Sequence, residues 1–198
     1  MKKIHLITAL CSALLFSACK KENAFKLDSG SVASWKGFLE TGYFNSGTIA
    51  LNASGISVSN GQIVGGKIEI PVSSILITNQ LPDDKKVELI NHLKSDAFFN
   101  MLVHPSVIYT VHTTQKLSTA DAEGNNYLIK GEMSLLGKIL PLDILAKIEN
   151  SKGAIHVKSE FKFDRTKWGM LYASDNALPP DQKIKNDIQV SIDIHISN

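Results

Sequence analysis

Apolar and polar residues alternate with a period of two in four stretches of the chain, and this alternation restricts the fold more than any other feature. In the clearest stretch, residues 187–196, isoleucine and valine occupy the even positions and polar residues the odd ones. The other stretches are residues 67–72, 142–149 and 155–163. Successive side chains of a strand point to opposite faces, so each stretch predicts a β-strand with one face buried and the other in solvent.

Turn signals separate further strand-like runs at residues 31–37, 47–52 and 55–59. Asn60-Gly61 between two apolar runs predicts a two-residue hairpin. Residues 83–95 alone predict a helix, which begins after Pro82 with two aspartates and continues with an apolar stripe. Many short strands and one short helix predict an all-β antiparallel domain. The pattern by itself leaves a sandwich and a closed barrel open.

The first 18 residues predict a secretory signal rather than part of that domain. Lys2 and Lys3 precede the apolar run Ile4–Phe16, which is too short to span a bilayer, and small residues follow it. Leu15–Cys19 is typical of a lipobox, in which the signal is cut before Cys19 and its sulfur is lipidated. Ordinary cleavage that leaves Cys19 free or paired is the alternative. Residues 19–24 are then a lipidated tether and 25–198 the folded domain.

Removal of the signal changes the charge of the chain. Lys2 and Lys3 are lost and no acidic residue is lost, so the net charge falls from +2 to zero. A neutral domain lacks the concentrated basic face that nucleic-acid binding needs. The sequence therefore predicts an envelope protein, exported and membrane-anchored on the periplasmic or surface side, without a nucleic-acid partner.

Several segments resemble, in order, the motifs of the YceI-like family. The segment His92–Asn100 resembles that family's H-L-K-S-x-D-F-F-D, and 104–109 follows it as the family's next motif does. Further similarities lie at residues 35–37 with 47–49, 131–142, 163–169 and 186–192. The resemblance covers the chain from Phe25 onward. It implies an antiparallel lipocalin-like β-barrel of about eight strands that binds polyisoprenoid lipids, including quinone-type molecules, in a long apolar cavity.

The chain departs from the family pattern at two places. Asn45-Ser46 stand where members of this sort often carry a histidine, and Asn100 stands where an aspartate is usual. Both departures concern the polar end of a ligand more than the fold.

The inward positions of the predicted strands are suited to an apolar tail. Together with the aromatic residues around them, the candidate ligand-binding residues are Phe98, Phe99, Tyr109, Tyr127, Ile129, Met133, Leu135, Val157, Phe161, Phe163, Arg165 and Trp168. The alternative is that these residues only fill a core, and periodicity alone favours it. Gly131 and Ser159 share the inward register, where a packed core prefers larger residues, so they favour a cavity.

Arg165 continues the inward register of residues 155–163. Because a buried charge needs a partner, Arg165 is a candidate to bind an oxygen of the lipid headgroup. The alternative is a structural role, in which Arg165 pairs with an acidic residue of the interior or extends its side chain to solvent. The Phe98-Phe99 pair could line a lid or seal the core. Trp35 and Trp168 are predicted to be packing residues.

No arrangement of residues predicts catalysis, a metal site or a cofactor. The five histidines outside the predicted signal are scattered without metal-ligand spacing, and two of them, His156 and His195, fall on outward registers. Nucleophile and phosphate-loop motifs are missing from the sequence. We therefore predict a lipid-binding protein and not an enzyme. An envelope protein with a structural or stress-related role and a filled barrel, and an enzyme acting on a lipid headgroup, remain as alternatives.

Overall fold

The computed structural model describes residues 25–151 and 153–197. Within these ranges the strands are β1 (Lys26–Leu27), β2 (Val32–Leu39), β3 (Phe44–Ala50), β4 (Asn52–Ser59), β5 (Gln62–Pro71), β6 (Leu76–Ile77), β7 (Ser106–Lys116), β8 (Tyr127–Leu135), β9 (Lys138–Pro141), β10 (Ile144–Ser151), β11 (Ala154–Asp164) and β12 (Ile184–Ser197). The helices are α1 (Asp83–Lys94) and two short 3₁₀ turns, η1 (Val72–Ser74) and η2 (Arg165–Trp168). The predicted signal, Cys19 and tether lie outside the described residues.

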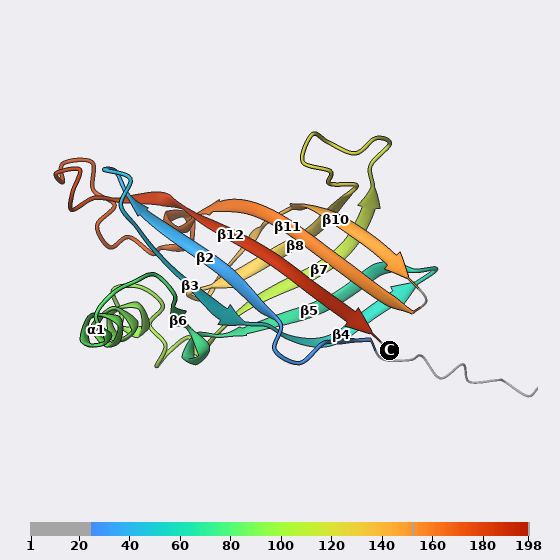
Figure 1. The fold of residues 1–198 in the computed structure, drawn as a ribbon, viewed down its shortest axis with the longest axis horizontal. Coiled ribbons are helices and arrows are strands. Elements are labelled where there is room, and N and C mark those ends of the chain that lie inside the picture. Colours follow the sequence, from blue (N-terminus) through green and yellow to red (C-terminus); the bar gives the residue numbers. More distant parts are fainter. Residues whose placement is uncertain (1–24, 152, 198) are drawn as a thin grey trace, which may run out of the picture.

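All strands belong to one antiparallel sheet that curls into a half-barrel (Figure 1). The strand order is β4-β5-β7-β8-β10-β11-β12-β2-β3-β6, with β1 beside β12 and β9 beside β8. A bridge between Phe25 and Ile56 brings the two sides of the sheet together at the end farthest from α1. The predicted all-β antiparallel class is confirmed, but the described part of the chain has twelve strands rather than about eight. Short strands such as β1, β6 and β9 account for the difference, because they are too short to show a period.

The alternating stretches form strands with the predicted faces. β11 and β12 pair from Ala154 opposite Ser197 to Asp164 opposite Asp187, and this register places Val157 beside Ile194 on the buried face. At the predicted hairpin, Asn60 and Gly61 both have positive φ, 51° and 74°. Two consecutive positive φ values characterise the hairpin turn that asparagine and glycine favour.

Helix α1 begins and ends where the sequence predicts. Its first turn contains Asp83 and Asp84 and its last contains Lys94, as the helix dipole favours. The Ser95 hydroxyl donates to the His92 carbonyl just beyond the helix. Among the described residues, no helix has the length and apolar character needed to cross a bilayer. The helix lies at one end of the half-barrel (Figure 1), with Leu93 buried against the core.

The interior differs between the two ends of the half-barrel. Away from α1 it is a packed core, made by Ile56, Ile63, Val111, Tyr127, Ile129, Ile144, Ala146, Ile148, Ile155, Val157, Ile194 and Ile196, each at most 8% exposed. Towards α1 the same sheet surrounds a hollow.

The two small inward residues do not mark that hollow. A Cβ on Gly131 would lie 2.6 Å from the Tyr109 hydroxyl and 2.5 Å from the Thr110 carbonyl oxygen. Gly131 therefore makes room for Tyr109. Ser159 is buried, and its hydroxyl donates to the Leu145 carbonyl. The inference of a cavity at these two positions is wrong, because a neighbouring ring and a backbone contact use the space.

We expect Gly131→Ala to lower the free energy of unfolding by about 2 kcal/mol, because the new methyl group would overlap backbone and a buried ring. Urea denaturation measures this loss. Gly65→Ala is the matched control, since a Cβ there meets only the Val111 carbonyl oxygen at 3.8 Å. Equal losses in the two variants would contradict the close packing at Gly131.

Candidate ligand-binding cavity

A cavity of about 240 Å³ lies between the inner face of the sheet and helix α1. Strand β2 contributes Ala33, Trp35 and Gly37, which alternate along the strand and therefore share a face. The other walls come from Ile49 on β3, Ile70 on β5, Met133 and Leu135 on β8, Phe161 and Phe163 on β11, and Ile184, Ile188 and Val190 on β12. Among the described residues that line the cavity, Asn45 alone is neither apolar, aromatic nor glycine.

Trp35 forms part of the wall because Gly47 makes space for it. A Cβ on Gly47 would lie 2.7 Å from the Trp35 ring and still closer to the Leu76 carbonyl oxygen. Gly47 lies directly opposite Trp35 on β3. Trp35 was predicted to be a packing residue, and its ring also borders the cavity.

The segment after α1 forms part of the cavity wall beside the helix. The Phe99 amide donates to the Leu93 carbonyl and the Asn100 amide to the Ser95 carbonyl, so the chain folds back on the helix. This turn brings Phe98 and Phe99 beside Leu89 and Leu93 in the cavity lining. Phe98 is buried, at 7% exposure.

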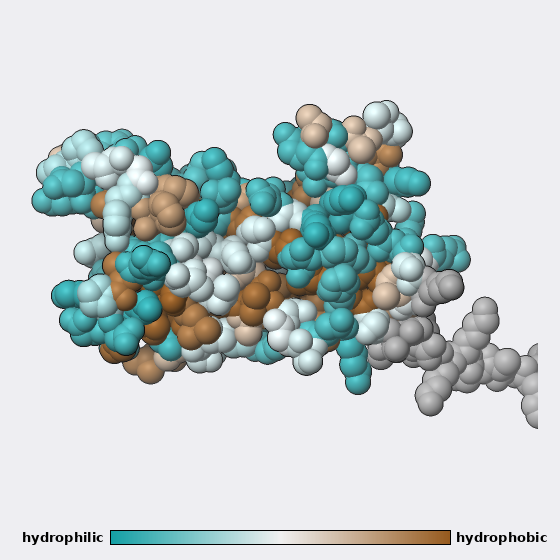
Figure 2. All heavy atoms as spheres, viewed as in Figure 1, coloured by the Kyte–Doolittle hydropathy of each residue, from teal (hydrophilic) through white to brown (hydrophobic). Residues whose placement is uncertain are grey.

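A more polar outer hollow adjoins the cavity. Tyr43, Asn45 and Leu89 line both spaces, and the outer hollow adds Leu81, Lys85, Glu88, His92 and Tyr172. The His92 ring meets Phe98 and Tyr172 edge-on, with centroids 5.0 and 4.7 Å away. Figure 2 shows apolar atoms at the surface around this end of the molecule. The cavity therefore has an aromatic and hydrogen-bonding mouth.

The charges at the mouth are paired. Lys85 Nζ lies 2.7 Å from Glu88 Oε2, and this contact holds the pKa of Glu88 below its usual value. The Asn45 Oδ1 accepts from Asn79 Nδ2 at 3.2 Å and from the Tyr43 hydroxyl. Asn45, at one of the two departures from the family pattern, is thus positioned by neighbours at the border between the apolar cavity and the polar mouth.

The structure divides the twelve candidate residues equally. Six line the cavity, namely Phe98, Phe99, Met133, Leu135, Phe161 and Phe163. Tyr127, Ile129 and Val157 belong to the packed core at the other end of the half-barrel. Tyr109, Arg165 and Trp168 are also buried but outside the lining.

Arg165 is fully buried, at 0% exposure, and its partners are backbone carbonyls. Nη1 donates to Met170 at 2.6 Å, Nη2 to Ile184 at 3.2 Å and Nε to Lys185 at 3.3 Å. Burial lowers the pKa of the guanidinium, and neighbouring Asp164 opposes that effect. The interior acid and the escape to solvent that the sequence suggested as structural alternatives are both wrong. Instead, Arg165 donates hydrogen bonds to the backbone of Met170 and Ile184 and so links two residues that line the cavity.

Tyr109 and Trp168 are both held by hydrogen bonds to backbone carbonyls, and Trp168 contacts the cavity wall from behind. The Tyr109 hydroxyl donates to the Leu142 carbonyl at 2.9 Å, and burial raises its pKa. Trp168 Nε1 donates to the Met133 carbonyl at 2.9 Å, and the ring meets Phe163 edge-on. Since Met133 and Phe163 line the cavity, Trp168 fixes the position of two wall residues.

Several lining residues were not among the candidates, and some had a usable signal. Ile188 and Val190 lie in the clearest alternating stretch, and Leu89 and Leu93 lie in the apolar stripe of the helix. For Ala33 and Gly37 on β2 the sequence contains no comparable signal, because small residues do not reveal a buried face.

A YceI-like domain model matches residues 24–196. The chain belongs to the YceI-like family. Solved structures agree on the fold at low identity. BcnA of Burkholderia cenocepacia is 12% identical with a TM-score of 0.62, over 85% of this chain and 98% of that chain. A polyisoprenoid-binding domain from Saccharophagus degradans is 14% identical with a TM-score of 0.61, over 88% and 98%. The Campylobacter jejuni YCEI protein is 15% identical with a TM-score of 0.53, over 100% and 99%. Among curated proteins, no relative matches this chain.

Proposed function

We propose that this YceI-like protein holds the tail of an isoprenoid or quinone-type lipid in the cavity beneath α1. The observation that carries the proposal is the lining, in which Asn45 is the one residue with an amide among apolar, aromatic and glycine residues. Covering roughly 300 Å² of tail would contribute about 7 kcal/mol before ordering costs, which suffices for binding without catalysis. The relative from Saccharophagus degradans, described as a polyisoprenoid-binding domain, supports the same class of ligand.

The size of the hollow limits the part of the ligand that is enclosed. At about 240 Å³ it is slightly smaller than most small-molecule sites, which measure roughly 300–1,000 Å³. At the far end of the half-barrel the inward residues are buried in a packed core. We propose that a few isoprene units occupy the cavity and that the head of the lipid lies at the mouth.

Export and anchoring complete the proposal. The predicted signal and lipobox support a protein tethered through Cys19 to a membrane of the cell envelope. The described domain begins at the end of the half-barrel opposite α1, and therefore opposite the mouth (Figure 1). The alternative, an envelope protein that acts through a partner surface with a filled barrel, draws support only from the packed end.

Organic-solvent extraction of the purified protein, followed by mass spectrometry, tests the proposal. We expect close to one isoprenoid or quinone-type lipid per protein after expression in a host that makes both. Protein that retains no lipid, and that also binds no added short-chain quinone, would contradict it.

The mouth favours a neutral head over a phosphate. Lys85 is paired with Glu88, and the remaining polar side-chain groups that line the mouth are the Asn45 amide, the His92 ring and the hydroxyls of Tyr43 and Tyr172. We expect a short-chain quinone to bind roughly tenfold or more tightly than a prenyl phosphate of equal length, because the phosphate would lose water without gaining a free cation. Isothermal titration calorimetry measures both constants. Tighter binding of the prenyl phosphate than of the quinone would contradict the proposal that the lipid has a neutral headgroup.

A further inference from the structure

Four ionisable side chains lie together on the outer face of the half-barrel, behind the packed core. Glu149 of β10 lies opposite His156 of β11, and His156 lies opposite His195 of β12. Asp193 precedes His195 by two residues and therefore shares its face. The inner neighbours of these residues are Val157 and Ile194, so the group projects away from the interior.

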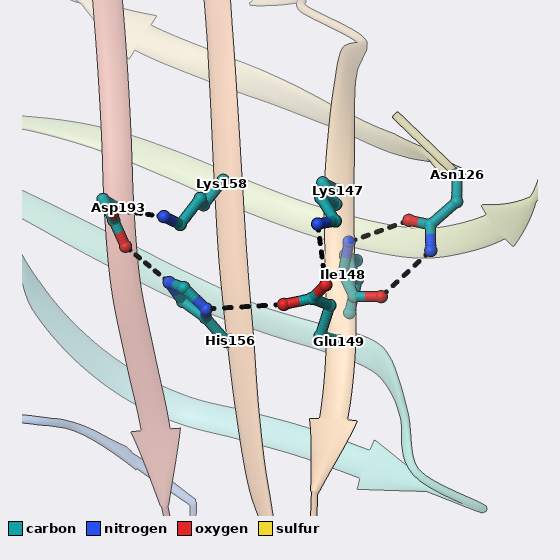
Figure 3. Close-up of polar contacts among 7 residues, drawn as sticks. All are labelled: Asn126, Lys147, Ile148, Glu149, His156, Lys158 and Asp193. Carbon is teal, nitrogen blue, oxygen red and sulfur yellow. Dashed lines mark hydrogen bonds and ion pairs between the residues drawn. The ribbon is translucent and has the colours of Figure 1, made fainter. Parts of the chain in front are cut away.

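The register brings nitrogen and oxygen donors within bonding range. One donor atom each from His156, Asp193 and His195 lies within 4.8 Å of the other two. The two imidazole rings stack with centroids 4.0 Å apart and planes inclined by 12°. His156 Nε2 contacts Asp193 Oδ1 at 2.5 Å, and Glu149 Oε2 lies 3.8 Å from His156 Nδ1 (Figure 3).

We propose that His156, Asp193 and His195 form a surface site for one late first-row divalent ion such as Zn²⁺, Ni²⁺ or Cu²⁺. Two imidazoles and one carboxylate are the ligands that these ions accept, and three protein ligands leave positions for water. Bonds of about 2.0–2.2 Å require the donor atoms to move closer together. Rotation of the side chains achieves this, since the paired strands already hold the three backbones in place.

The neighbouring charges are compatible with such an ion. Lys158 contacts Oδ2 of Asp193 at 3.0 Å and leaves Oδ1 on the histidine side (Figure 3). Glu149 Oε2 lies on the side of Nδ1, the second ring nitrogen of His156. Carboxylates commonly accept a hydrogen bond from the second ring nitrogen of a metal-bound histidine. With only one carboxylate facing the two imidazoles, the site does not suit Mg²⁺ or Ca²⁺, which take oxygen ligands.

Calorimetry on the full, untagged chain tests the site, after chelator treatment and alkylation of the cysteines. We expect saturable binding of one equivalent of Zn²⁺, tighter binding of Cu²⁺ and no binding of Mg²⁺. His156→Asn and His195→Asn should each weaken Zn²⁺ binding at least tenfold. His112→Asn is the matched control, because His112 is exposed like His195 and lies 3.4 Å from a carboxylate, Glu132, but does not belong to the cluster. It should leave binding unchanged.

Thermal stability provides a second measurement. Zn²⁺ should raise the melting temperature of the wild-type chain and of His112→Asn but not of His195→Asn, because an ion that binds only the folded state stabilises it. Lack of saturable Zn²⁺ binding by the wild type, or equal weakening in all three histidine variants, would overturn the proposal. The lipid extraction described above is independent of both results, since the cluster lies on the opposite face of the sheet from the cavity.

Discussion

Gly37→Leu is expected to reduce the lipid that the purified protein carries by roughly tenfold or more while the protein stays folded. Gly37 lies on β2 in the wall of the cavity, and a Cβ there would meet only the Ile188 side chain, at 3.5 Å. The leucine side chain would then extend into the space that we assign to the lipid tail. Overlap of this kind is worth about 1–3 kcal/mol, and each 1.4 kcal/mol changes affinity about tenfold.

Gly65→Leu is the control for this experiment. Gly65 lies on β5, outside the cavity lining, and a Cβ there is also tolerated. Both variants should keep the circular dichroism spectrum of the wild type, and only Gly37→Leu should lose lipid in the extraction assay. Unchanged lipid content in folded Gly37→Leu would show that the ligand lies elsewhere.

Arg165→Met is expected to lower the free energy of unfolding by about 3 kcal/mol or more. The substitution keeps an unbranched chain but leaves three carbonyls without their donor. The contact with Met170 is buried and the other two are partly buried, and each unpaired buried group costs about 1–3 kcal/mol. Because one ammonium group cannot reproduce the planar fork of donors, Arg165→Lys should recover only part of the loss. Urea denaturation measures all three proteins.

Lys167→Met is the control, since Lys167 is exposed on the same short helix, η2. It should be nearly as stable as the wild type. If Arg165→Met were equally stable, the carbonyl contacts would not be what keeps the arginine buried. Arg165→Lys also separates the structural role of the arginine from a role in ligand binding. As long as this variant remains folded, we expect its lipid content to be unchanged. A loss of lipid without a loss of stability would favour the hypothesis that Arg165 binds the headgroup.

Local patterns were sufficient for the fold class, the helix and the hairpin. Alternation in residues 187–196 predicts a strand with one buried face, and the aspartates at 83 and 84 predict a helix start. Such signals depend on neighbours in the sequence, and the structure confirms each of them. The number of strands was underestimated because β6, with two residues, is too short to have a period.

The candidate site could be predicted only in part. Phe163 and Val157 share one face of β11, yet the first lines the cavity and the second lies in the packed core. Alternation indicates the face of a strand on which a residue lies. It contains no information on what stands opposite that face across the interior.

The sequence by itself determined which faces of the alternating strands point inward, where the helix and the hairpin lie, and that Arg165 continues an inward register. The tertiary structure alone decided which end of the half-barrel is hollow, which carbonyls receive the Arg165 guanidinium and that His156 lies against His195. The physical reason is range: the direction of a side chain along a strand follows from adjacent residues, whereas enclosed volume and cross-strand partners depend on strands that the register brings together from distant parts of the chain.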